Sequence, residues 1–141
     1  MSSKSRYALM ALVELDLRTR GSGRPVRLID LAAERGIPEP YLEQLFAALG
    51  RAGLVMGRRG VGGGFTFARR PDEMTVLDVV EALDGPRGPA DGDGADLPDL
   101  SGAGAVWHAA GDAYKGVLAG TTVSDLADRE RHLGNGSDYE I

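Results

Sequence analysis

The fold is decided by a stretch that reads Ile37-Pro-Glu-Pro-Tyr-Leu-Glu-Gln-Leu-Phe46 and then Leu54-Val-Met-Gly-Arg-Arg-Gly-Val-Gly-Gly-Gly-Phe-Thr-Phe-Ala-Arg-Arg-Pro71. The first part predicts a helix that begins near Pro38 and Pro40, because the first helical turn tolerates proline. The second part predicts a hairpin, because short β-prone runs flank a glycine cluster. A helix of groove width followed by a basic β-ribbon is typical of a winged-helix DNA-binding domain.

The predicted helix separates an apolar face from a polar one. Its apolar residues at helical spacing are Leu42, Leu45, Phe46 and Leu49. Tyr41, Glu43 and Gln44 lie on other faces, where glutamine can pair with adenine edges and glutamate can accept from cytosine N4. A preceding helix over residues 29–35, with an inward face formed by Leu31, Ala32 and Ala33, ends at Gly36. The short turn between the two helices predicts a helix-turn-helix.

The sequence on either side completes this domain. Residues 5–19 have helical apolar spacing, and residues 26–28 could form a short strand. At the hairpin tip, Arg58 and Arg59 beside Gly60 suit insertion into a narrow minor groove. Arg69 and Arg70 are expected near phosphates.

The C-terminal half is predicted to hold three helices and a loop. Thr75 with Asp78 begins one helix, and Thr122 with Asp125 caps a short final helix that ends at His132. Residues 85–104 are rich in glycine, proline and aspartate, which predicts a loop. Residues 105–119 form an amphipathic helix that needs a partner surface.

Charge and composition limit the function. Residues 1–70 carry 12 Lys/Arg against 6 Asp/Glu, whereas residues 71–141 carry 4 against 15, so an acidic chain has a basic half suited to a polyanion. The chain has no cysteine, which excludes disulfides and cysteine-ligated clusters. No apolar run approaches membrane-span length and no signal-peptide core follows Met1. We therefore expect a cytoplasmic protein.

Several motifs together resemble the Rrf-two family of bacterial winged-helix regulators. They are Ser5-Arg-Tyr-Ala-Leu, Leu31-Ala-x-x-x-Gly-Ile37, Tyr41-Leu-Glu-Gln-Leu, Ala52-Gly-Leu-Val55, Arg59-Gly-x-Gly-Gly-Gly-Phe, Val76-Leu-x-Val-Val-Glu-Ala-Leu-Asp-Gly85 and Thr122-Val-x-Asp-Leu126. The resemblance implies a homodimer, joined by crossing C-terminal helices, in which each winged helix reads half of a double-stranded DNA operator. The residues expected to contact DNA are Lys4, Arg6, Tyr41, Glu43, Gln44, Arg58, Arg59 and Gly60. Pro38 and Pro40 replace the serines that are commoner in the family, so hydroxyl contacts are lost there.

The predicted fold is thus mainly α with a small β-hairpin. Residues 1–84 form the winged helix-turn-helix domain and residues 85–104 a flexible loop. Residues 105–132 hold a long dimerisation helix and a short final helix, and residues 133–141 form a flexible tail.

Nothing in the sequence predicts a cofactor, a metal site or an enzyme. Cluster-binding members of the family carry three cysteines in the segment that here offers Asp91, Asp93, Asp96 and Asp99. This segment fails the calcium-loop pattern, because Ala95 and Gly102 fall at its fifth and twelfth positions. His108 and His132 are assigned structural roles, and no nucleophile–base pair is apparent.

The C-terminal tail predicts a partner protein through which the regulator receives its signal. Asp138, Tyr139, Glu140 and Ile141 resemble the C-terminus of serine acetyltransferase, whose terminal isoleucine enters the active site of O-acetylserine sulfhydrylase. A terminal carboxylate beside a branched side chain can imitate an amino-acid substrate. A cysteine-free member of the family regulates cysteine metabolism through this same enzyme.

The resulting hypothesis is a repressor of sulfur and cysteine metabolism genes that responds through the sulfhydrylase. Two alternatives stay open. One is a cluster-free regulator that senses a small molecule or redox signal through Trp107, Tyr114 or His108. The other is an interaction protein that inhibits the sulfhydrylase without binding DNA.

Overall fold

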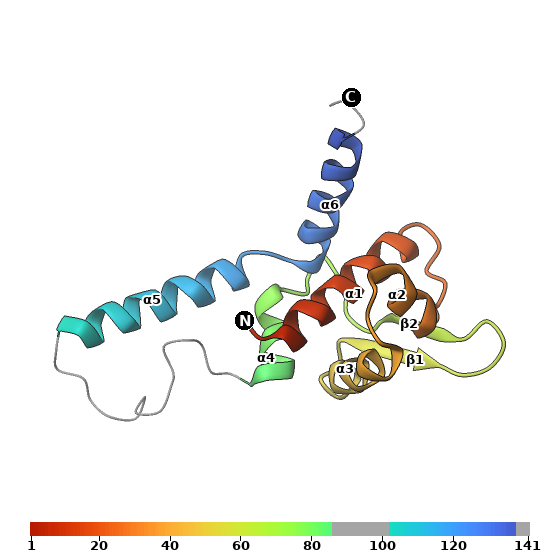
Figure 1. Cartoon of the computed structure of the whole chain (residues 1–141), viewed down its shortest axis with the longest axis horizontal. Helices are drawn as coiled ribbons and strands as arrows, with labels where there is room; N and C mark the ends of the chain where they lie inside the picture. The colour runs from red at the N-terminus through yellow and green to blue at the C-terminus, as the bar shows by residue number, and fades with distance from the viewer. Residues whose placement is uncertain (86–101, 138–141) are drawn as a thin grey trace.

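The computed structural model describes residues 1–85 and 102–137, which contain six helices and one hairpin (Figure 1). The elements are α1 (Ser3–Thr19), α2 (Leu28–Arg35), α3 (Glu39–Arg51), β1 (Val55–Arg58), β2 (Gly64–Phe67), α4 (Val76–Asp84), α5 (Gly102–Ala119) and α6 (Val123–Ser137). Helix α1 is central and packs against α2, α3, α4 and α6. The prediction of a mainly α chain with a small β-hairpin is confirmed.

The core lies between α1 and the helices around it. Its fully buried members include Leu12, Leu31, Leu42, Phe46, Leu49 and Val79. The rings of Phe46 and Phe65 meet edge to face with centroids 5.0 Å apart, which joins α3 to β2. The apolar stripe predicted for α3 is buried, and it fixes which face of that helix remains outside.

The helix-turn-helix forms because Gly36 adopts a left-handed conformation, with φ of 65° and ψ of 33°. Its N–H donates to the Ala32 carbonyl, which ends α2 and turns the chain toward α3. Proline is accommodated at the start of α3, as the sequence predicted. One expectation was wrong: Ala33 is exposed rather than inward, because α2 buries a narrow stripe formed by Leu28, Leu31 and Ala32.

The hairpin is antiparallel, with Val55 opposite Phe67 and Arg58 opposite Gly64. Strand β2 also pairs with Val26, which precedes α2. The Val26 N–H donates to the Phe65 carbonyl at 2.9 Å, and the Phe65 N–H donates to the Val26 carbonyl at 2.8 Å. The strand expected over residues 26–28 is therefore a single bridge, because α2 already begins at Leu28.

Helix α4 begins with the predicted capping box, in which Thr75 accepts from the Asp78 N–H at 3.0 Å and Asp78 accepts from the Thr75 N–H at 2.9 Å. The chain at the start of α4 also holds the start of α6. The Val76 N–H donates to the Thr121 carbonyl at 2.8 Å, and the Val123 N–H donates to the Met74 carbonyl at 2.8 Å.

The last two helices are longer than predicted. Helix α5 begins at Gly102, inside the expected loop of residues 85–104, and residues 86–101 of that loop lie outside the described residues. Helix α6 has the predicted Thr122–Asp125 cap but continues to Ser137, so part of the expected tail is helical. Glycine weakens a helix by about 1 kcal/mol relative to alanine, whereas only proline would block it outright. The rest of the tail, residues 138–141, lies outside the described residues.

Candidate nucleic-acid interface

The polar face of α3 carries two of the predicted base-reading side chains. Glu43 and Gln44 are exposed on this helix, next to the turn that follows Gly36. Tyr41 is half-buried, and its ring packs edge to face against Tyr7 of α1 with centroids 5.7 Å apart. Tyr41 therefore holds α1 and α3 together, and only part of its ring is open to a ligand.

The hairpin tip, which we call the wing, comprises Arg58–Gly64. Arg58 ends β1, and both Arg58 and Arg59 are exposed without a salt bridge to any residue that the structure describes. Gly60, with φ of 96°, accepts at its carbonyl from the Gly63 N–H at 2.9 Å. A Cβ on Gly63 would overlap the Arg58 carbonyl, so this tight turn requires glycine.

A cleft of about 690 Å³ separates the wing from the first turns of α2 and α3. Arg27, Arg58 and Arg59 line it, together with the exposed side chain of Ile29 and one carboxylate, Glu39. Cations predominate in the space between the two elements expected to enter neighbouring DNA grooves.

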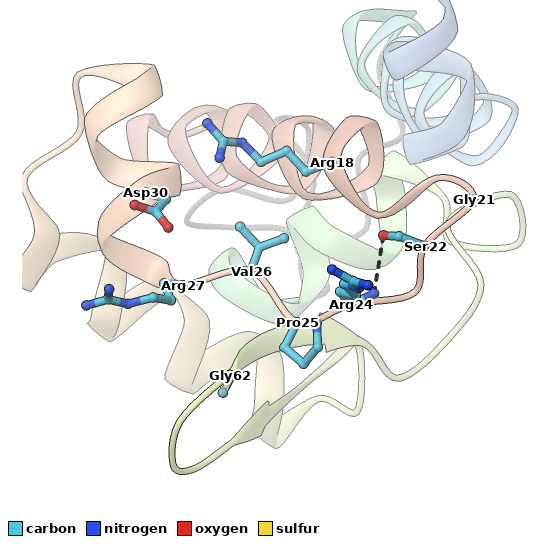
Figure 2. A pocket seen from close by; sticks show the side chains of 10 residues that line it. Arg18, Gly21, Ser22, Arg24, Pro25, Val26, Arg27, Asp30 and Gly62 are labelled. Atoms are coloured by element: carbon cyan, nitrogen blue, oxygen red, sulfur yellow. Dashed lines mark hydrogen bonds between the residues drawn. The ribbon is translucent and has the colours of Figure 1, made fainter.

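A second cleft, of about 830 Å³, lies between the wing and the α1–α2 loop (Figure 2). Figure 2 shows Arg18, Arg24 and Arg27 around it, with Gly62 of the wing at its edge. Arg18 is neutralised by Glu14, with Nε 2.7 Å from Oε2, and its pKa is raised chiefly by that hydrogen bond. Arg24 and Arg27 have no salt bridge within the described chain.

The two arginines after the hairpin are held by carboxylates. Arg69 Nη2 lies 3.3 Å from Asp78 Oδ2 and donates to the Glu73 carbonyl at 3.2 Å. Arg70 Nη2 lies 2.6 Å from Asp72 Oδ2. Both guanidinium groups are exposed but already paired with carboxylates, and their place near phosphates stays a prediction.

Lys4 and Arg6 are exposed on the first turn of α1, and a partly buried polar cluster fixes that turn. Ser2 Oγ lies 2.6 Å from Asp84 Oδ1, and the buried Ser5 hydroxyl donates to Asp84 Oδ2 at 2.8 Å. Burial raises the pKa of Asp84, but hydrogen bonds from Ser2 and Ser5 outweigh it and leave this pKa below its ordinary value. Sequence reasoning missed this cluster; its one signal was a serine in the N-cap position.

Two arginines join α6 to the winged-helix body. Arg20 lies 3.0 Å from Asp16 and 2.6 Å from Asp128 of α6, and the hydrogen bonds that it donates to these carboxylates raise its pKa. Arg35, at the end of α2, lies 2.7 Å from Glu130 and also pairs with Glu14 of α1. Helix α6 is therefore tied to both helices that precede α3.

Helix α5 leaves much of its apolar surface uncovered. In Figure 1 it extends away from the body on the side opposite the wing. Val106, Trp107 and Val117 are 63%, 64% and 68% exposed, respectively, whereas Leu118 near the helix end packs against the core. No helix in the described part of the chain is long and apolar enough to cross a membrane.

The helix-turn-helix, the glycine-built wing and the arginines around it define a winged helix-turn-helix DNA-binding regulator. The chain belongs to the Rrf2 (Rrf-two) family: a family model described as an iron-dependent transcriptional regulator matches residues 1–129. Its relatives are DNA-binding transcription regulators, which agrees with the prediction that it is not an enzyme.

Individual relatives support this placement. The chain is 37% identical over 127 residues to the HTH-type transcriptional regulator CymR of Bacillus subtilis, covering 90% of this chain and 88% of that protein. The solved structure of CymR, the global cysteine regulator of B. subtilis, matches with a TM-score of 0.77 and 35% identity, over 92% of this chain and 96% of that one. The structure of T. potens IscR matches with a TM-score of 0.73 and 32% identity, over 100% of this chain and 90% of that one.

The side chains available as metal ligands do not fit the cysteine-ligated iron–sulfur cluster that an iron-dependent family suggests. The chain contains no cysteine, and the described residues bring together no three His, Asp or Glu side chains able to hold a metal. His108 and His132 are exposed on separate helices, α5 and α6, and join no such group.

Proposed function

We propose that this chain represses genes of sulfur and cysteine metabolism and responds to O-acetylserine sulfhydrylase bound at residues 138–141. The observation that carries the proposal is similarity to CymR, a cysteine regulator, over 90% of this chain. The absence of cysteine favours an input other than a cluster, and the acidic-aromatic tail offers one. As a regulator of operator DNA, the protein would act in the cytoplasm.

The proposed DNA complex uses α3 and the wing together. Glu43 and Gln44 read base edges in the major groove, and Arg59 enters the adjacent minor groove. Arg58, the Gly60 backbone and the first turn of α1, with Lys4 and Arg6, contact the sugar-phosphate chains. Tyr41 contributes through its exposed edge, in keeping with its packing against Tyr7.

The proposed homodimer forms through α5. An apolar face as exposed as that of Val106, Trp107 and Val117 is typical of a surface that a partner covers. A second copy supplies an identical apolar helix, so an isologous contact can cover both faces at once. The two winged helices would then face two operator half-sites.

The salt bridges of α6 offer a route from the tail to the DNA-binding elements. Arg20 and Arg35 connect α6 to α1 and α2, and α2 packs directly against α3. A partner held at residues 138–141 would favour DNA binding only if it prefers the α6 position that suits operator spacing. In this scheme O-acetylserine competes for the enzyme's active site, releases the complex and relieves repression.

Deletion of Ile141 tests the proposed input. We expect the truncated protein to lose binding to O-acetylserine sulfhydrylase in isothermal titration while binding DNA as the full chain does. An exchange of Ile141 for leucine is the matched control, because it keeps the terminal carboxylate and a branched side chain. Undiminished enzyme binding by the truncated protein would refute the role of the tail.

A gel shift on the promoter of the protein's own gene separates this function from its alternatives. An interaction protein without DNA binding would shift no duplex at any protein concentration. A regulator that senses a small molecule directly would bind DNA and respond to the signal even after residues 138–141 are removed.

A further inference from the structure

Two arginines outside the predicted recognition helix and wing line the clefts beside the wing and form no salt bridge to a described residue. We propose that Arg27, assisted by Arg24, binds the phosphates of the DNA strand that passes between the wing and the body. This inference rests on the proposed DNA-binding surface and adds a contact that the family motifs do not assign.

Arg27 lines both clefts. It borders the space between the wing and the first turns of α2 and α3, and also the space between the wing and the α1–α2 loop shown in Figure 2. In the proposed complex, a strand that runs from the major groove at α3 to the minor groove at the wing crosses the space between these two elements, which Arg27 borders. Of these two clefts, Arg24 lines only the second.

The backbone of Arg27 is held on both sides, which fixes the origin of its side chain. Val26 is paired with Phe65 through two hydrogen bonds, and the Arg27 carbonyl accepts from the Asp30 N–H at 3.0 Å. The side chain itself is exposed. Binding therefore costs side-chain ordering but no rearrangement of the backbone.

The charges that line the clefts are unequally neutralised. Arg18, which also lines the second cleft, is occupied by Glu14 and Glu34. Arg24 and Arg27 have no carboxylate within salt-bridge distance among the residues described, and Asp30 is the one acidic side chain lining that cleft. The cleft thus presents uncompensated positive charge.

This chemistry suits a polymer of phosphates better than a single small anion. Arg24 and Arg27 are exposed and lie apart on the α1–α2 loop beside the wing, rather than gathered around one point (Figure 2), so an isolated anion would remain hydrated and screened. DNA gains more from such a row, because each neutralised phosphate releases condensed counterions.

Fluorescence anisotropy of the full chain at several salt concentrations tests the proposal. The probes are a duplex from the promoter of the protein's own gene and a scrambled duplex of the same length. We expect Arg27→Ala to reduce the slope of log affinity against log salt by about 0.9 per bound protomer. It should weaken binding to both duplexes alike, by roughly eightfold per protomer at 0.1 M salt.

Three further variants make the outcome decisive. Arg27→Lys keeps one positive charge and should retain the slope, whereas Arg131→Ala removes an exposed charge from α6 and should change neither slope nor affinity. If Arg59→Ala weakens binding but Arg27→Ala leaves slope and affinity unchanged, the proposal is wrong and the proposed function stands. An Arg27→Ala effect confined to the promoter duplex would indicate base reading and would also overturn it. Failure of the unaltered protein to bind either duplex would overturn the proposed function as well.

Discussion

Replacement of Gly64 by alanine tests how the wing is attached to the body. Gly64 begins β2 with φ of 146°, and a Cβ there would lie 2.5 Å from the Val26 carbonyl carbon and oxygen and 2.9 Å from the Arg27 nitrogen. All three are backbone atoms, so no change of rotamer can relieve the overlap. The strand must therefore move away from Val26.

The expected loss of stability follows from the hydrogen bonds that this movement breaks and from the strain at Gly64. The two hydrogen bonds between Val26 and Phe65 contribute about 1 kcal/mol each. The positive φ adds roughly 1–2 kcal/mol of strain for a residue with a side chain. We expect Gly64→Ala to lower the free energy of unfolding by about 3–4 kcal/mol, with faster amide exchange at Val26 and Phe65.

Urea unfolding of this variant beside Gly62→Ala checks the reasoning. Gly62 has φ of 79° but nothing within 4 Å of an added Cβ, so it should lose only the strain, roughly 1–2 kcal/mol. Equal losses of stability in the two variants would show that the close approach to Val26 does not hold the wing.

Three other changes test the interface and its supports. Arg59→Ala should weaken operator binding by about 1–3 kcal/mol in anisotropy titrations, and unchanged affinity would refute the wing assignment. Because the folded-state pKa of Asp84 is depressed by Ser2 and Ser5, its contribution to stability is present above the ordinary value of 3.8 and is lost as pH falls through the lower folded value. Asp84→Asn should therefore be less stable at neutral pH and lose less stability on acidification, as urea melts across this range would show. Trp107→Glu places a charge on the exposed apolar face of α5 and should shift a dimer toward monomer in analytical ultracentrifugation; an unchanged mass would place the dimer contact elsewhere.

The DNA-binding elements could be predicted because their signals are local. Gly36 at the end of α2, the apolar stripe of α3 and the glycines of the wing each determine the backbone within a few residues. The capping boxes before α4 and α6 are equally local, since Thr75 and Thr122 each bond an aspartate three residues later. Such patterns need no knowledge of tertiary contacts.

The contacts that position these elements could not be predicted, because they join distant parts of the chain. Ser2 and Asp84 are 82 residues apart, and nothing local marks either as a partner of the other. Arg35 meets Glu130 only once α6 packs against α1. Tyr41 is half-buried because it packs against Tyr7 in another helix. The helical spacing of apolar residues in α3 could not reveal this contact.

In the folded chain, fewer Lys and Arg side chains are left without a salt bridge than the charge count of the sequence suggests. Five of the 12 Lys/Arg in residues 1–70 form salt bridges, and Asp72, Asp78, Asp128 and Glu130 from the acidic half neutralise four of them in whole or in part. The seven without a salt bridge to a described residue are Lys4, Arg6, Arg24, Arg27, Arg51, Arg58 and Arg59. Four of these seven line the two clefts beside the wing. The acidic half thus concentrates the positive potential at the wing, where a polyanion gains most from it.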